Sequence, residues 1–214
     1  MLNGIFDMDK PFWRWIGKLP DMIGLSLCWY ICCLPLITFI PASCALYDAV
    51  SRNLRTDEKG SFARFFRTFV RELKRGIPLS IFWILIFAVA VLGLTFMNQN
   101  AQANPMFSYF SPIYLVLTVM MVAYLGWLIP LQSRFHNNFW GLHINAMRFS
   151  IGRLWGSLGM LLSTAGVIAV CLLHTMTLPL ICLAPCLIAL LHSIPVERGF
   201  RIVFPQYFED EENN

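Results

Sequence analysis

Apolar and polar stretches alternate along this chain over lengths that match the thickness of a membrane. Five apolar runs occupy residues 22–47, 77–97, 112–131, 156–173 and 178–194. Each run reaches the minimum of roughly 17 residues with which a helix crosses the hydrocarbon layer of a bilayer. The pattern therefore predicts an all-α fold, a polytopic membrane helical bundle with about five transmembrane helices in a single domain of residues 1–214.

Two prolines, Pro35 and Pro41, interrupt the first run. Because proline removes a helical hydrogen bond and kinks the chain, residues 22–47 either cross the membrane once with a kink or dip in and turn back. Residues 1–21 mix acidic and basic side chains with Phe and Trp, which is typical of an interfacial segment at headgroup depth. The acidic tail, residues 205–214, is expected to be solvated and mobile.

A cytoplasmic amphipathic helix is predicted over residues 61–75. Ser61 is a suitable N-cap, and phenylalanines recur at steps of three and four, the spacing of one helical face. Arginines fall largely on the other face, so the helix suits the boundary of an anionic membrane. The alternative is that its apolar face packs on the protein's own core. We assign a membrane-interface or partner-binding role to Phe62, Arg64, Phe65, Phe66, Arg67, Phe69 and Arg71.

The distribution of basic residues predicts the orientation. The net charge is +4, and 13% of the residues are charged. Lys and Arg concentrate in residues 48–76 and 132–155, whereas residues 98–111 and 174–177 hold none. Basic loops stay on the cytoplasmic side, so the C-terminus is expected there, and we favour five crossings with the N-terminus outside. Because residues 76–133 carry no charged side chain, no nucleic-acid-binding surface is expected.

The motifs of several catalytic classes are missing from the sequence. It has no Gly-x-x-x-x-Gly-Lys-Ser/Thr phosphate loop, no His-Glu-x-x-His and no Gly-x-Ser-x-Gly elbow. The cysteines lie in or beside apolar runs and are interpreted as small buried hydrophobic residues. Cys182 and Cys186, with His174 and His192 nearby, leave a metal or redox site as the weakest hypothesis. We therefore expect no catalytic, metal-binding or cofactor-binding residue and no enzymatic activity.

Several short motifs resemble those of a known family. They are Trp29 with Leu34-Pro35 and Thr38, then Ala45-Leu46-Tyr47, the phenylalanines of the basic helix, and Asn145-Ala146. Together they resemble the YesL-like family of bacterial membrane proteins, a domain of unknown function. The resemblance implies a multi-pass plasma-membrane protein whose genes often neighbour those of carbohydrate ABC transporters and glycoside hydrolases. It implies no biochemical activity.

Two functional hypotheses follow. The first is a non-catalytic accessory or regulatory partner of a carbohydrate uptake system, which contacts the lipid bilayer and an ABC-type sugar permease. The alternative is a small oligomeric transporter or channel for a sugar or another solute. Its candidate path is polar and aromatic, and consists of Trp29, Pro35, Thr38 and Tyr47, with Trp83, Tyr124 and Trp127 beside them.

Overall fold

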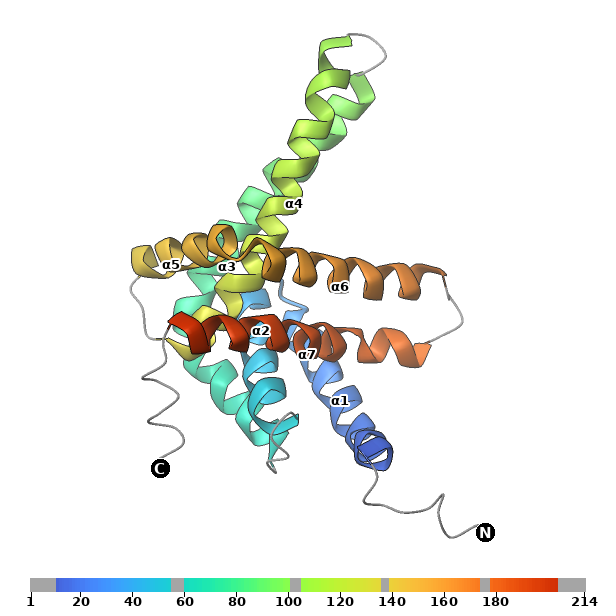
Figure 1. Cartoon of the computed structure of the whole chain (residues 1–214), viewed down its shortest axis with the longest axis vertical. Coiled ribbons are helices and arrows are strands. Elements are labelled where there is room, and N and C mark those ends of the chain that lie inside the picture. Colours follow the sequence, from blue (N-terminus) through green and yellow to red (C-terminus); the bar gives the residue numbers. More distant parts are fainter. Residues whose placement is uncertain (1–10, 55–59, 101–104, 136–138, 174–177, 204–214) are drawn as a thin grey trace.

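The computed structural model describes residues 11–54, 60–100, 105–135, 139–173 and 178–203. Over these residues the chain is helical (Figure 1), and its helices are α1 (Pro11–Cys33), α2 (Phe39–Ala49), α3 (Ser61–Asn100), α4 (Pro105–Arg134), α5 (Phe139–Gly152), α6 (Leu154–Leu173) and α7 (Leu178–Val203). A π-helical turn, Val50–Leu54, continues α2. The described residues contain no strand, so the all-α prediction is confirmed.

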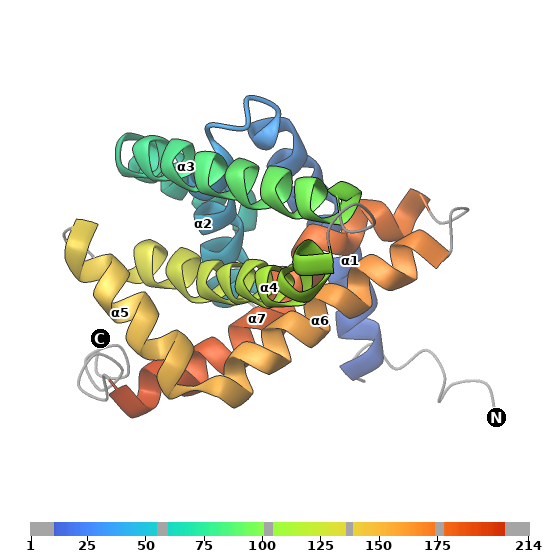
Figure 2. The same cartoon turned by 90° about the horizontal axis from the view of Figure 1, so that it is seen from above.

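Antiparallel pairs of helices, α1–α2, α3–α4 and α6–α7, make up most of the described fold. Helix α5 follows the second pair along the chain, packs on α4 and leads into α6. In Figure 1 the α3–α4 pair runs along the long axis of the molecule, and the α6–α7 pair runs across it. Figure 2 shows α3 and α4 side by side, with α6 and α7 on the α4 side. Because the two pairs run in different directions, both can span one bilayer only if each is tilted from the bilayer normal. Tilts of up to about 40° occur in membrane proteins.

Four helices of the described chain, α3, α4, α6 and α7, are long and apolar enough to cross a membrane. They contain the predicted spans 77–97, 112–131, 156–173 and 178–194. Large apolar side chains are exposed on them, such as Leu85, Leu92 and Leu162. A surface of this kind is stable against lipid and not against water, so the structure agrees with the predicted membrane helical bundle.

Residues 22–47 form two helices instead of one span. Helix α2 runs back along α1 (Figure 1), and the indole Nε1 of Trp29 donates to the Oγ of Ser43 at 3.2 Å across the pair. The turn between them is apolar and exposed, with Leu34 at 79% and Leu36 at 67% exposure. The expected five crossings counted this region as one crossing. The structure has a helical hairpin here, which leaves the four candidate crossings named above.

The predicted helix 61–75 and the predicted span 77–97 are one continuous helix, α3. Its buried face recurs at steps of three and four and packs on α2; it includes Ser61, Phe65, Thr68, Glu72, Gly76 and Leu79. A Cβ added to Gly76 would lie 2.6 Å from the Cδ of Pro41, so the two helices approach closely there. The helix continues through Pro78, and its buried face reaches Leu79 and Ser80 just beyond that proline.

Helix α4 begins at Pro105 and not at Pro112, so most of the predicted linker 98–111 is helical. Proline is suited to the first position of a helix in either case. Across the pair, the Oγ of Ser111 donates to the Oδ1 of Asn98 at 2.6 Å. The polar residues that suggested a linker thus join the far ends of α3 and α4.

Trp127 is the largest fully buried side chain of the described residues, and it lies where α4, α6 and α7 meet. Its Nε1 donates to the Oγ of Ser157 at 2.9 Å, and its ring stacks on Phe149 with the centroids 5.3 Å apart. A Cβ added to Gly156 or Gly199 would lie 3.0 Å from the indole ring. Both glycines therefore make room for Trp127, which fixes how the α6–α7 pair crosses α4.

Candidate functional site

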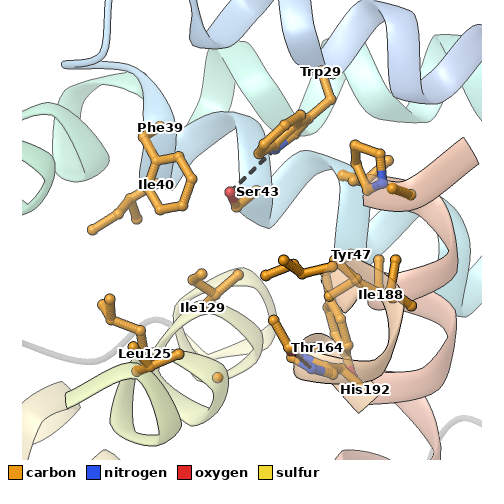
Figure 3. Close-up of a pocket in the computed structure, with 18 of the residues that line it drawn as sticks. Trp29, Phe39, Ile40, Ser43, Tyr47, Leu125, Ile129, Thr164, Ile188 and His192 are labelled. Carbon is orange, nitrogen blue, oxygen red and sulfur yellow. Dashed lines mark hydrogen bonds between the residues drawn. The ribbon is translucent and has the colours of Figure 1, made fainter. Parts of the chain in front are cut away.

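A cavity of about 940 Å³ lies between the three helical hairpins. Its wall takes residues from α1, α2, α3, α4, α6 and α7, several of which are seen in Figure 3. At one end Ile40, Tyr47 and Ser80 are no more than 2% exposed. Other lining residues are exposed, with Leu36 at 67%, Val91 at 48% and Leu172 at 73%. The cavity is therefore a cleft that is closed at the end lined by the buried residues and open on the side lined by the exposed ones.

Most polar groups in the wall bond to the protein itself, although the buried indole Nε1 of Trp83 has no hydrogen-bond partner among the described residues. The Oγ of Ser80 accepts the backbone N–H of Ile40 at 3.0 Å. The Oγ1 of Thr164 lies 2.9 Å from the Nε2 of His192, and both atoms reach the carbonyl oxygen of Met160. The rest of the lining is almost wholly aliphatic and aromatic. The wall thus suits an apolar ligand and offers few hydrogen bonds to a polar one.

The exposed part of the cleft is apolar and would face lipid in a bilayer. Removing apolar surface from water is favourable, and an apolar wall offers water few hydrogen bonds. We therefore expect the cleft to be filled by an apolar group when the protein is in a bilayer.

Two of the four predicted path residues, Trp29 and Tyr47, line the cavity. Pro35 and Thr38 lie in the turn between α1 and α2, outside the lining. The hydroxyl of Thr38 donates to the carbonyl oxygen of Cys32, which satisfies a carbonyl at the end of α1. The structure therefore brings the two aromatic members together, but it does not assemble the four residues into one polar path.

A buried carboxylate belongs to the residue that follows Tyr47, which lines the closed end of the cavity. Asp48, near the end of α2, is 6% exposed. The Oγ1 of Thr68 in α3 donates to its Oδ2 at 2.6 Å, and the Nε of Arg52 lies 3.4 Å from its Oδ1. Hydrogen bonds and ion pairs of this kind stabilise a charge that is removed from water. Sequence reasoning missed Asp48 because Thr68 approaches it only when α2 and α3 pack together.

A second buried carboxylate is Glu72, which is 3% exposed. The Nε of Arg71 lies 2.9 Å from its Oε1, and the Nη2 of Arg71 donates to the carbonyl oxygen of Ser133 in α4 at 3.3 Å. One residue further on, Arg134 pairs with Glu197 of α7 at 3.1 Å. These bonds join the basic ends of α3, α4 and α7. Glu72 is the one acidic residue of the predicted basic helix, and that was the signal available in the sequence.

The residues assigned to a membrane-interface role lie on different faces of α3. Phe65 is fully buried, as the alternative of core packing predicts, and Phe69 is partly buried beside it. Phe62 and Phe66 are exposed and form an apolar stripe with Val70 at steps of four residues. The apolar stripe lies along one flank of the buried face, and the arginines lie along the other flank. Arg64 is partly exposed, and Arg67 and Arg71 are exposed. The interface role stays a prediction for the exposed members.

No three His, Cys, Asp or Glu side chains of the described residues come together to hold a metal ion. The seven cysteines are free thiols. Cys186 is buried, and its backbone N–H donates to the Oγ of Ser26 at 3.2 Å. His174, which belongs to the weakest sequence hypothesis, lies outside the described residues.

Comparison with protein families matches residues 22–94 to the family described as "Protein of unknown function, DUF624". The matched range holds α2 and the parts of α1 and α3 that pack on it, so it includes the closed end of the cavity and both buried carboxylates. This match agrees with the resemblance to the YesL-like family that the sequence motifs indicate, and so it confirms that resemblance for residues 22–94. Comparisons with curated proteins and with solved structures find no match.

Proposed function

We propose that this chain, whose residues 22–94 match the DUF624 family, is a non-catalytic multi-pass protein of the bacterial plasma membrane. Its role would be that of an accessory or regulatory partner in carbohydrate uptake. The observation that carries the proposal is the exposed apolar surface of the α3–α4 pair, which extends beyond the rest of the molecule in Figure 1. Leu92 and Tyr109 on this surface are 68% and 77% exposed. Apolar helix surfaces of this kind pack against lipid and against the spans of a partner.

An ABC-type sugar permease is the partner that the family resemblance favours. Its spans would pack on the α3–α4 surface, while the arginine side of α3 lies at the cytoplasmic headgroups. The buried carboxylates and most polar groups around the cavity form bonds within the protein, such as Thr68 to Asp48. This arrangement supports a binding role over a catalytic one.

The same contacts support an orientation. Arg71 bonds to Ser133, and Arg134 pairs with Glu197, so the basic ends of α3, α4 and α7 lie together. The positive-inside rule supports a cytoplasmic location for these ends, and with it a cytoplasmic C-terminus. The α1–α2 hairpin then enters from the cytoplasmic face, with its apolar turn in the bilayer and the start of α1 inside.

Co-purification tests the accessory role. The tagged chain is extracted with a mild detergent from cells that express a sugar permease, and the permease is identified by mass spectrometry. We expect its recovery with the wild type and with the control Leu162→Trp, and a strong loss with the double variant Leu92→Trp/Ile113→Trp. All three positions expose a large apolar side chain, but only the double variant alters the α3–α4 surface. A transporter that remains intact and is never recovered with the chain contradicts the proposal.

The cavity is the observation that favours the alternative, a small oligomeric transporter. Its apolar lining argues against a sugar as the solute, because each buried hydroxyl without a partner costs about 1–3 kcal/mol. Flux into proteoliposomes tests this alternative directly. Uptake of a sugar through the purified chain alone would favour it over the accessory role, and absence of uptake across a broad panel of sugars would remove its support.

A further inference from the structure

The cleft between the hairpins has the chemistry of a lipid-binding site. We propose that it holds the acyl chains of a membrane phospholipid as a resident ligand. This inference goes beyond the accessory role and does not depend on it, since it rests on the cavity alone. The walls come chiefly from α3, α4, α6 and α7, the four described helices that are apolar enough to cross a membrane, so the cleft lies at the depth of the hydrocarbon layer.

The polarity of the wall decides which class of ligand fits. In Figure 3 the labelled side chains around the space are mainly aliphatic and aromatic. The hydroxyl of Ser43 is bonded to Trp29, and Thr164 is bonded to His192, so these groups are occupied by the protein. A sugar or an ion would lose its bonds to water and find few replacements here. An acyl chain loses no hydrogen bond on entry and covers apolar surface.

The volume agrees with a small-molecule ligand. The cavity measures about 940 Å³. This lies within the range of roughly 300–1,000 Å³ that is usual for sites binding small molecules. A slender acyl chain fits a space of this size.

The exposure of the lining shows where the chain enters. Val91 of α3, Leu172 of α6 and Ile181 of α7 line the cavity and are 48%, 73% and 40% exposed. Ile40 and Tyr47, at the closed end, are 1% and 2% exposed. Leu36, in the turn between α1 and α2, also lines the cavity and is 67% exposed. An acyl chain would enter on the side of these exposed residues and end against Ile40 and Tyr47 of α2. The open side is apolar, so a lipid reaches the cleft from the bilayer without crossing water.

Filling the cleft with side chains tests the proposal. The double variant Ala88→Phe/Ala184→Phe places two rings in the lining, whereas Ala165→Phe/Ala169→Phe places them on exposed positions of α6 outside it. Each protein is reconstituted in phosphatidylethanolamine and phosphatidylglycerol vesicles, extracted in mild detergent and analysed by native mass spectrometry. We expect the wild type and the control to retain a phospholipid, and the cleft variant to retain at least about fivefold less. Equal retention by the cleft variant, or no retention by the wild type, overturns the proposal.

A second measurement uses the wild-type chain, so that misfolding of a variant cannot imitate the result. A phospholipid with a photoreactive group near the end of one acyl chain is incorporated into the same vesicles. The protein is extracted before illumination, so that only retained lipid reacts. We expect adducts on peptides that contain the lining residues Ile84, Phe87 and Ile188. Adducts confined to the exposed far end of the α3–α4 pair would contradict the site.

Discussion

The hydroxyl of Ser157 holds the packing of the α6–α7 pair on α4, because it accepts the indole N–H of the fully buried Trp127 at 2.9 Å. Replacing Ser157 by alanine leaves that N–H buried without this acceptor. An unsatisfied buried donor costs about 1–3 kcal/mol. For a chain of about this length, each kcal/mol lowers the melting temperature by roughly 2–4 °C, so we expect a decrease of roughly 2–12 °C.

Thermal unfolding of the purified protein in detergent, followed by circular dichroism, measures this effect. The matched control is Ser163→Ala on the same helix, where the hydroxyl bonds only to the carbonyl of Met160 one turn before it. We expect the control to lower the melting temperature by about 2 °C or less, because the Met160 carbonyl also accepts other bonds.

A double-mutant cycle then isolates the bond between the two side chains. Trp127→Phe removes the donor. In that background, Ser157→Ala should lower the free energy of unfolding by about 1 kcal/mol less than it does in the wild type. Equal melting temperatures for Ser157→Ala and Ser163→Ala, or strict additivity in the cycle, would show that the bond does not stabilise this contact.

The close packing of α2 on α3 gives further predictions. Gly76→Ala should destabilise by about 1–3 kcal/mol, since the added Cβ would lie 2.6 Å from the ring of Pro41, whereas Gly159→Ala, with no heavy atom within 4 Å, should stabilise by up to about 1 kcal/mol. Thr68→Val should cost about 1.5–3 kcal/mol, because it removes the hydrogen bond to the buried carboxylate of Asp48. Denaturation in mixed micelles measures the stability of all three variants. Unchanged stability in Gly76→Ala or in Thr68→Val contradicts the contact that the substitution alters. Reversing the charge of three arginines should disturb insertion or orientation, as measured by cysteine accessibility, and an unaltered topology would show that the signal is redundant. These are Arg64, Arg67 and Arg71.

Four of the five apolar runs lie in candidate spans of the described chain, because the length of a helix across a bilayer is fixed by the hydrocarbon thickness. The ends of the helices were harder to predict. Pro112 looked like the start of a span, yet α4 begins at Pro105 because α3 and α4 pair beyond the apolar stretch. Pro35 marked a real break, but whether the chain then crossed or returned depended on the contacts between α1 and α2, such as Trp29 with Ser43.

The candidate site was the least predictable part. Six helices line the cavity, and its volume depends on how far the hairpins diverge. No local sequence pattern determines that divergence. Asp48 and Glu72 read as ordinary residues of a polar loop and a basic helix, although tertiary packing buries both. Phe65 was assigned to the interface together with Phe66, but one turns into the core and the other faces outward. Adjacent positions on a helix face different directions, and only packing decides which direction is inside.

The arrangement in the membrane is tested most directly by labelling single cysteines from outside intact cells, in a variant whose native cysteines are replaced. The three positions are Asn100 at the end of α3, Lys74 near its basic beginning, and Leu36 in the turn of the α1–α2 hairpin. We expect a membrane-impermeant maleimide to react with Asn100→Cys in intact cells, with Lys74→Cys only after permeabilisation, and with Leu36→Cys in neither case. Reaction of Lys74→Cys in intact cells, or of Leu36→Cys at the rate of a water-exposed residue, would contradict the account.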